Sequence, residues 1–351
     1  MKNTFTHSRE PFISVLICSL NGGKRIGDCL DSLNGQTYGR ENFEIIVVDD
    51  GSSDDTGIIA KSYSVQVIRN EINKGIPSAR NAALSAARGE IVVFIDDDCV
   101  ADTQWLSSLV ATFEDKSVVA VGGRILALST KTIAQRYLQA TAYGNPARLL
   151  SGGKSSIFQR LMGYINTMIS PILFENLPVE VSAVYTANAA YRRDVLLRLG
   201  GFDETLLTNE DSDVSERLRK IVGSRIMYIP MAIVRHQHYE KISKVIYQPY
   251  RRAINTLQFY LKDKRIPPLF PMPVLYVVFV IVLSLAHDIL LLSAGIILTP
   301  LLLYGWWIIR ALREKNIEYL FYPYIQILVE GGVLLGFIKG WFSMLFRPMS
   351  I

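Results

Sequence analysis

Three consecutive carboxylates follow a short apolar run in this sequence. Residues Ile91–Ile95 are all apolar, as in a buried parallel strand, and Asp96, Asp97 and Asp98 come directly after them. Open α/β sheets bind ligands at the carboxyl ends of their strands. Because neighbouring carboxylates repel one another by about 4 kcal/mol at an effective dielectric of 20, a divalent cation is an economical way to keep them ionised.

The spacing indicates which of these aspartates share a site. Alternate residues of an extended segment point the same way, so we expect Asp96 and Asp98 to face one site and Asp97 to point elsewhere. Hard oxygen ligands favour Mg²⁺ or Mn²⁺, ions that commonly bridge phosphates. For an isolated motif, a solvated acidic turn would be the better explanation.

A second apolar run also ends in carboxylates. Asp49 and Asp50 follow the run Phe43–Val48. Acidic side chains after a strand can hold a ribose hydroxyl or a base N–H. Ser52 or Ser53 can cap the helix that follows, which is compatible with that role.

Further charged groups stand at two predicted helix starts. Lys74 and Arg80 lie on either side of Pro77, which opens an Ala-rich helix, and basic groups at a helix start suit phosphate oxygens. Glu210 and Asp213 share the first turn of another predicted helix, where the helix dipole keeps carboxylates ionised. For Glu210 and Asp211, plain helix capping is the alternative to a catalytic role.

Alternating strands and helices must position these groups. Short β-branched runs bounded by polar turns predict strands, and apolar residues at helical spacing predict helices between them. Such alternation predicts an α/β sandwich with an open, mostly parallel sheet. The expected strands are Phe12–Cys18, Phe43–Val48, Val65–Ile68 and Ile91–Ile95, and the expected helices lie around Ile26–Leu33, after Ser52 or Ser53, from Pro77 to near Gly89, and over Trp105–Phe113.

The composition divides the chain into an ordinary soluble part and an apolar part. Of 351 residues, 50% are hydrophobic and 20% charged, which excludes disordered, collagen-like and disulfide-stapled proteins. The excess of apolar residues lies after Leu269. Two runs, 269–286 and 289–309, are each close to the roughly 20 residues that cross a bilayer. Pro323, Gln326 and Glu330 interrupt a third candidate, 319–338.

Basic residues flank these runs. By the positive-inside rule both flanks, and the α/β domain with them, lie in the cytoplasm. We therefore expect a multi-pass integral membrane protein with a cytoplasmic catalytic domain. The flanking residues are Lys262, Lys264, Arg265, Arg310, Arg313 and Lys315.

A basic segment interrupts the α/β region. The sequence has no Asp or Glu between Asp115 and Glu175 but has seven Lys or Arg there. Interleaved apolar residues suit an anionic membrane surface, and an ordinary solvated insertion explains the composition equally well. The expected domains are an α/β domain 1–240 with a basic insert 125–178, a basic amphipathic linker 241–268 and a membrane domain 269–351.

The ordered set of motifs resembles the family-2 glycosyltransferases with the GT-A fold, from about Phe12 to His238. The resemblance implies an inverting sugar transfer from a UDP- or GDP-linked donor, with Mg²⁺ or Mn²⁺ on the diphosphate. The matching pieces are Ser14-Val-Leu-Ile with Asn21, Glu44-Ile-Ile-Val-Val-Asp-Asp-Gly-Ser-Ser-Asp, Asn73-Lys-Gly with Ala79-Arg-Asn, Phe94-Ile-Asp-Asp-Asp, Thr186-Ala-Asn, Gly200-Gly-Phe-Asp and Asn209-Glu-Asp-Ser-Asp.

The resemblance also implies roles for single residues. Asp211 is the general base, with Glu210 beside it, and takes the proton of the sugar hydroxyl that attacks C1. Asp96 and Asp98 form the DxD motif, with Asp98 as the more direct metal ligand, and His236 completes the metal shell. The expected donor contacts are Asn21, Asp49, Asp50, Lys74, Arg80, Asp96 and Asp97.

One motif departs from a related pattern. The segment from Gln248 to Arg252 resembles the QxxRW motif of processive polysaccharide synthases, but Arg252 stands in place of Trp. This departure disfavours chain polymerisation. Gln248 and Arg251 can still bind a donor phosphate, and a solvated basic helix before the membrane is equally compatible.

The expected acceptor is a lipid or lipid-linked glycan, because the catalytic residues would be tethered at the bilayer. Two rival functions are a non-catalytic membrane-bound scaffold that binds nucleotide sugar, and a nucleotidyltransferase. Intact Asp96, Asp98 and Asp211 disfavour the scaffold, and the nucleotidyltransferase would need a Gly-rich triphosphate loop, for which Asn21–Arg25 is a weak match. A nucleic-acid partner is not expected, since the positive charge lies in the insert and at the membrane flanks.

Overall fold

The computed structural model describes residues 10–141, 164, 177–262 and 270–345. The chain divides into two compact units. The described part of the first unit comprises 10–128 and 177–237, and that of the second comprises 129–141, 164, 238–262 and 270–345. Most of the predicted basic insert, and the end of the predicted linker, lie outside the described residues.

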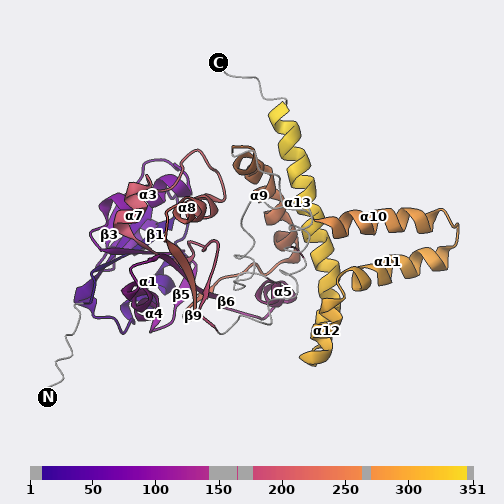
Figure 1. Cartoon of the computed structure of the whole chain (residues 1–351), viewed down its shortest axis with the longest axis horizontal. Helices are drawn as coiled ribbons and strands as arrows, with labels where there is room; N and C mark the ends of the chain where they lie inside the picture. The colour runs from indigo at the N-terminus through magenta and orange to yellow at the C-terminus, as the bar shows by residue number, and fades with distance from the viewer. Residues whose placement is uncertain (1–9, 142–163, 165–176, 263–269, 346–351) are drawn as a thin grey trace. The chain divides into compact units, whose positions relative to one another are not determined.

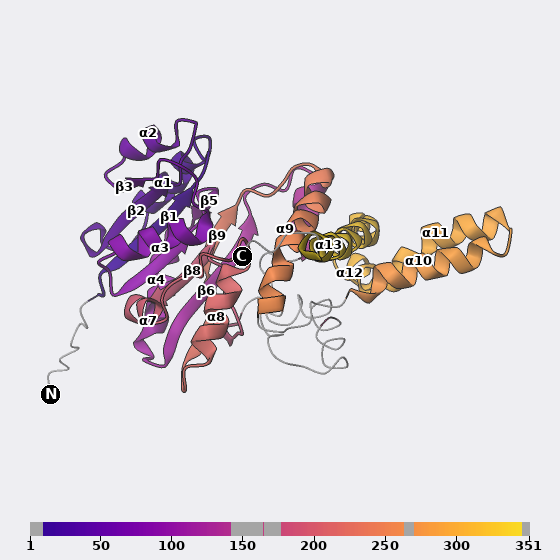
Figure 2. The same ribbon diagram turned by 90° about the horizontal axis from the view of Figure 1, so that it is seen from above.

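Over its described residues, the first unit is built on one sheet of nine strands (Figures 1 and 2). The strand order is β3–β2–β1–β4–β8–β6–β9–β5, and β7 pairs with β9. The first four strands in this order are parallel, whereas β8 is antiparallel to both of its neighbours. The strands are β1 Ile13–Ser19, β2 Phe43–Asp49, β3 Gln66–Arg69, β4 Ile91–Ile95, β5 Cys99–Ala101, β6 Val118–Ala127, β7 Val179–Glu180, β8 Asn188–Arg192 and β9 Arg225–His236.

Helices cover both faces of this sheet (Figure 1). Buried residues of α1, α2 and α4 pack on one face, and buried residues of α3, α7 and α8 pack on the other. Each fully buried Leu or Ile in these layers contributes roughly 1.5–3 kcal/mol. The helices are α1 Ile26–Asn34, α2 Thr56–Lys61, α3 Ile76–Ala86, α4 Trp105–Val110, α7 Arg193–Arg198 and α8 Glu210–Arg219, with short 3₁₀ turns at Arg40–Asn42 and Ala111–Glu114.

The α/β sandwich predicted from the sequence is confirmed. Strand β4 has the predicted bounds, β2 ends one residue later than predicted, and β1 and β3 are each shifted by one residue at both ends. The expectation that Ser52 or Ser53 caps the next helix is wrong. Helix α2 begins at Thr56, whose N–H donates to the Asp54 side chain at 3.1 Å, while the Ser52 hydroxyl accepts from the backbone of Asn21.

The second unit is helical over its described residues. Helices α9 and α13 pack closely, since a Cβ on Gly336 would lie 2.4 Å from the Tyr250 carbonyl oxygen and one on Gly340 would lie 2.7 Å from that of Ile254. Both contacts advance along the two helices together, so the helices run in the same direction. An aromatic core around Tyr137, Trp307 and Tyr322 joins the other helices. The helices are α5 Ile133–Thr141, α9 Ile242–Lys262, α10 Pro271–Ser284, α11 Ile289–Leu303, α12 Trp306–Arg313 and α13 Tyr322–Leu345, the last preceded by a 3₁₀ turn at Ile317–Phe321.

The apolar helices differ in length from the predicted spans. Helices α10 and α11 have 14 and 15 residues, which makes them about 21–23 Å long against a hydrocarbon core of about 30 Å. The predicted spans 269–286 and 289–309 are therefore not straight, unbroken helices, since a turn ends α10 at Ser284 and a 73° bend separates α11 from α12. Among the described residues one helix, Ile317–Ser343, is long and apolar enough to cross a membrane, and the bent pair makes a second if it counts as one span.

Candidate active site

The three aspartates after β4 lie in different environments. Asp97 accepts a hydrogen bond from the Ser19 hydroxyl and lies 3.2 Å from Arg25 Nη2. Asp96 lies 3.6 Å from the Arg80 guanidinium. Asp98 instead lies close to His236. Asp97 therefore has different partners from Asp96 and Asp98, and a shared site for Asp96 and Asp98 stays a prediction.

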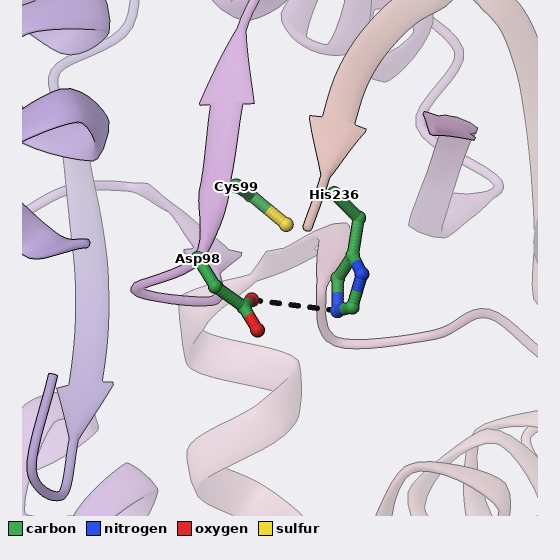
Figure 3. A group of neighbouring side chains, drawn as sticks. All are labelled: Asp98, Cys99 and His236. Carbon is green, nitrogen blue, oxygen red and sulfur yellow. Dashed lines mark ion pairs between the residues drawn. The ribbon is translucent and has the colours of Figure 1, made fainter. Parts of the chain in front are cut away.

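Asp98, Cys99 and His236 form a compact cluster (Figure 3). Antiparallel pairing of β5 with β9 sets Cys99 opposite His236, and the ligand atoms of all three residues lie within 4.8 Å of one another. His236 Nε2 is 3.4 Å from Asp98 Oδ1. That oxygen is buried and has no hydrogen-bond partner among the described residues. Burial, opposed by His236 and reinforced by the neighbouring aspartates, raises the pKa of Asp98 to about 6.

The chemistry of this cluster fits a hard divalent cation. A carboxylate oxygen and an imidazole nitrogen both suit Mn²⁺, and a cation would give Asp98 Oδ1 the partner it lacks. Burial raises the pKa of the Cys99 thiol well above its ordinary value. Sulfur is a soft ligand, whereas Mg²⁺ and Mn²⁺ prefer harder donors, so Cys99 is a poor ligand for these ions. Asp98 and His236 are therefore the residues that would hold the ion.

A buried guanidinium links the aspartates to helix α8. Arg80 on α3 pairs with Glu210 in the first turn of α8 and lies 3.6 Å from Asp96. Burial alone would lower the pKa of Arg80, but the carboxylates of Glu210 and Asp96 outweigh it and raise the pKa. Arg80 is thus a fixed positive charge between the two acidic groups, although 130 residues separate it from Glu210.

Asp211 lies beside Glu210 and is poorly satisfied. It accepts a hydrogen bond from the Ser212 backbone N–H at 2.7 Å and has no other hydrogen-bond partner among the described residues. Burial and the Glu210 carboxylate raise the pKa of Asp211 to about 7, and Arg80 opposes this rise. A carboxyl group with a pKa near neutrality suits a general base.

Tyr191 on β8 is a further group near Asp211. Its hydroxyl is buried without a hydrogen-bond partner among the described residues. Burial raises the pKa of Tyr191, and the charge of Asp211 raises it further. Sequence reasoning missed Tyr191, because a tyrosine within an apolar strand carries no signal beyond core packing.

Asp49 and Asp50 brace the loops at the same sheet edge. Asp50 accepts hydrogen bonds from Asn70 Nδ2 at 2.7 Å and from the backbone N–H groups of Lys74 and Gly75 at 3.0 and 2.9 Å. Asp49 is fully buried and accepts from the Ser52 backbone at 2.9 Å. Both carboxylates are therefore engaged by the protein itself.

The remaining predicted donor contacts are dispersed. Asn21 Oδ1 accepts from the Ser53 backbone at 2.9 Å, which joins the loops after β1 and β2. The Lys74 side chain is exposed. Gln248 and Arg251 lie on α9 of the second unit, where Arg251 is exposed. The structure thus gathers Asp96, Asp98, His236, Arg80, Glu210 and Asp211 in the first unit, and the sequence did not reveal the supporting Ser19, Arg25 and Cys99.

Comparisons with known proteins agree with this fold. The family model described as glycosyl transferase family 2 matches residues 14–200. The pre-mycofactocin glycosyltransferase of Mycobacterium tuberculosis is 30% identical over 67% of this chain and 46% of its own length. The glucosyl-dolichyl phosphate glucuronosyltransferase of Haloferax volcanii is 25% identical over 65% of this chain and 70% of its own. This chain spans less than half the length of two of its curated relatives, the mycobacterial enzyme among them.

A solved structure supports the same architecture. The mannosyltransferase of Pyrobaculum calidifontis, solved with GDP-Man and Mn²⁺, aligns over 96% of this chain and 88% of its own, with 18% identity and a TM-score of 0.55. At that identity the likeness establishes the fold, which is of the GT-A type. With a family model that matches more than half of its residues, this chain belongs to glycosyl transferase family 2.

Proposed function

We propose that the chain transfers a sugar from a UDP- or GDP-linked donor, with inversion, to a lipid or lipid-linked acceptor at the cytoplasmic face of a membrane. The observation that carries the proposal is Asp211, a poorly satisfied carboxyl group with a pKa raised to about 7. It follows Glu210, which Arg80 links to the DxD aspartate Asp96. A proton acceptor and a diphosphate-binding motif are thereby held in one unit.

Asp211 performs the proton transfer in this proposal. The acceptor hydroxyl oxygen bonds to C1 of the sugar, its proton moves to Asp211, and the bond from C1 to the diphosphate oxygen breaks on the opposite side. The nucleoside diphosphate leaves with the electron pair of that bond. Mn²⁺ or Mg²⁺, held by Asp98 and His236, would neutralise charge on the diphosphate when bound.

Other residues bind the donor. Arg80 is a buried cation next to Asp96 and can position Glu210, so that it orients the DxD motif and the base helix together. Asp50 holds the backbone of Lys74 and Gly75 and so shapes the loop expected to meet the nucleoside. In this proposal Asn21, Asp49 and Asp97 fix the surrounding loops of the first unit.

The proposed acceptor rests on two observations. The Haloferax relative is named for action on a glucosyl-dolichyl phosphate, a lipid-linked sugar. The second unit of this chain carries an exposed apolar helical hairpin, which suits attachment to a bilayer. Arg313 at the end of α12 and Lys315 just after it favour the cytoplasmic side.

A panel of nucleotide sugars tests the proposal. We expect the purified full chain to hydrolyse one UDP- or GDP-sugar slowly with Mn²⁺ or Mg²⁺, to transfer that sugar to a lipid extract, and to stop when EDTA is added. Asp98→Asn should abolish both reactions, and Asp194→Asn, which alters an exposed carboxylate of α7, should not. Donor binding without any turnover would instead support a nucleotide-sugar-binding scaffold, and activity in EDTA would contradict the metal assignment.

A further inference from the structure

The hairpin of α10 and α11 is apolar on every side. Its large side chains are mostly exposed, including Val278 at 53%, Leu290 at 78% and Leu298 at 52%. On α10 the structure buries Pro273, and on α11 it buries Gly295, Thr299 and Pro300. A helix that is hydrophobic all round is normally buried in a core or in lipid. The described residues provide no such core around this hairpin.

The two helices pack on each other and close into a compact unit. A Cβ on Gly295 would lie 2.0 Å from Leu283 Cδ1, so the helices approach as closely as glycine permits. At the tip, Asp288 Oδ1 accepts from the backbone N–H groups of Leu290 and Leu291 at 2.8 and 3.0 Å. Unsatisfied N–H groups are costly in lipid, and this cap satisfies two of them.

Helix α13 forms most of the segment Ile317–Ser343, which is long and apolar enough to cross a membrane, but its surface is more polar than that of the α10–α11 hairpin. Glu330, near its middle, is buried and accepts from Tyr304 at 2.9 Å and from Gln326 at 2.9 Å. Lys339 is exposed and lies over the Tyr250 ring. A polar network and a lysine indicate a helix that is partly held in protein rather than one surrounded by lipid.

Helix α9 adds charge along α13. Gly332, Gly336 and Gly340 face the backbone of Ile246, Tyr250 and Ile254 in turn, so the two helices run side by side in the same direction. In this stretch α9 exposes Arg251 and Arg252. If α13 crossed a bilayer, it would carry these arginines toward the hydrocarbon, where each charge is expensive.

The direction of the α10–α11 hairpin shows that the hairpin and α13 cannot both stand perpendicular to the same membrane. Both views show α10 and α11 projecting sideways from the axis of α13 (Figures 1 and 2). A bilayer that receives the hairpin end-on therefore has α13 lying along its surface. Aromatic and basic residues, which favour the interface, lie near the base of the hairpin, namely Trp306, Trp307, Tyr319, Arg313 and Lys315.

We propose that the α10–α11 hairpin is the membrane-embedded element of this chain and that α13 lies with α9 at the bilayer surface. The proposal rests on the membrane attachment in the proposed function and names the element that provides it. It places the first unit and the end of α13 on the same side of the membrane. A membrane-spanning α13 would place them on opposite sides.

Two pairs of substitutions test the embedded element. Val278→Lys with Leu298→Lys alters exposed positions of the hairpin, and the matched pair Leu335→Lys with Ile338→Lys alters exposed positions of α13. We expect the hairpin variant to lose at least about tenfold of its binding to phosphatidylglycerol–phosphatidylethanolamine vesicles in flotation, because two charges would enter hydrocarbon. The α13 variant should change by less than about twofold. Loss in the α13 variant, or retention in the hairpin variant, would overturn the proposal.

Sidedness provides a second measurement. Single cysteines at Val222→Cys in the first unit and Phe342→Cys on α13 replace exposed residues. In inverted membrane vesicles that contain the full chain, a membrane-impermeant maleimide should label both variants from the same side, with the native chain as background. Labelling from opposite sides would contradict the proposal. Neither readout uses sugar transfer, so the proposed reaction can fail without affecting this result.

Discussion

Two buried or half-buried carboxylates, one in each unit, have opposite surroundings. Glu330 in the second unit accepts hydrogen bonds from Tyr164, Tyr304 and Gln326 at 2.7–2.9 Å. Asp211 in the first unit accepts one hydrogen bond, from the backbone of Ser212, and stands beside another carboxylate. This difference assigns Glu330 a structural role, because a carboxylate that accepts several hydrogen bonds stabilises the fold. It assigns Asp211 a reactive role, because a carboxylate with few hydrogen bonds and a raised pKa can accept a proton.

The largest expected effect is on catalysis, at Asp211. Asp211→Asn should lower kcat by about 10²–10⁴ while donor binding changes little, because the amide cannot take the proton. Steady-state kinetics and calorimetric donor titration measure the two quantities. Full activity in this variant would remove the base assignment.

The thermal stability of Asp211→Asn provides a second test of the raised pKa of Asp211. The pKa of Asp211 in the folded chain, about 7, is raised above the ordinary aspartate value. Folding therefore disfavours its ionised form, and the resulting loss of stability grows as pH rises from the ordinary value to about 7. We expect Asp211→Asn to raise Tm at pH values above 7, and a lower Tm there would contradict this account.

The next largest effect concerns the metal. His236→Ala should weaken Mn²⁺ binding by at least about tenfold and leave the fold intact. Electron paramagnetic resonance of free Mn²⁺ measures the affinity. His287→Ala, at an exposed turn of the second unit, is the matched control. Equal Mn²⁺ affinity in the two variants would exclude His236 as a ligand.

For Glu330 we expect the opposite pattern to Asp211, a loss of stability without a loss of activity. Glu330→Gln should destabilise the chain by about 1–3 kcal/mol, because a buried hydrogen-bond network loses an acceptor, and should leave kcat of the remaining folded protein unchanged. Denaturant unfolding measures the change, and Glu240→Gln, at an exposed position of the same unit, is the control. If Glu330→Gln lowered kcat without lowering stability, the comparison of the two carboxylates would fail.

The smallest effect is a shift in pH dependence. The Glu210 carboxylate raises the pKa of Asp211, and Arg80 lowers it. Glu210→Gln removes the first influence and leaves the second, so the acid limb of the kcat profile should move to lower pH. A limb that stays in place or moves to higher pH would show that Glu210 does not act on the base through its charge.

Much of the first unit could be predicted from the sequence because its signals are local. Short apolar runs and the polar residues that end them gave β4 its bounds and located the carboxylates at the sheet edge. The pairing of Arg80 with Glu210 could not be predicted, since it joins residues 130 positions apart. The burial of Tyr191 beside Asp211 and the support of Asp97 by Ser19 and Arg25 also depend on tertiary packing.

The second unit was less predictable for a physical reason. Apolar composition locates a hydrophobic helix but not its ends, and a turn before Ile289 and a bend after Leu303 shortened two expected spans. The interrupted run around Glu330 became the longest apolar helix because its polar residues found partners inside the unit.

The pH dependence of sugar transfer tests the central claim, that Asp211 is the base. With saturating donor and Mn²⁺, we predict that kcat of the native chain rises about tenfold per pH unit below about pH 7 and levels off above it, following the raised pKa of Asp211. Asp211→Asn should lose this limb. A native profile that stays flat between about pH 5.5 and 8.5, with the same profile in the variant, would contradict the account.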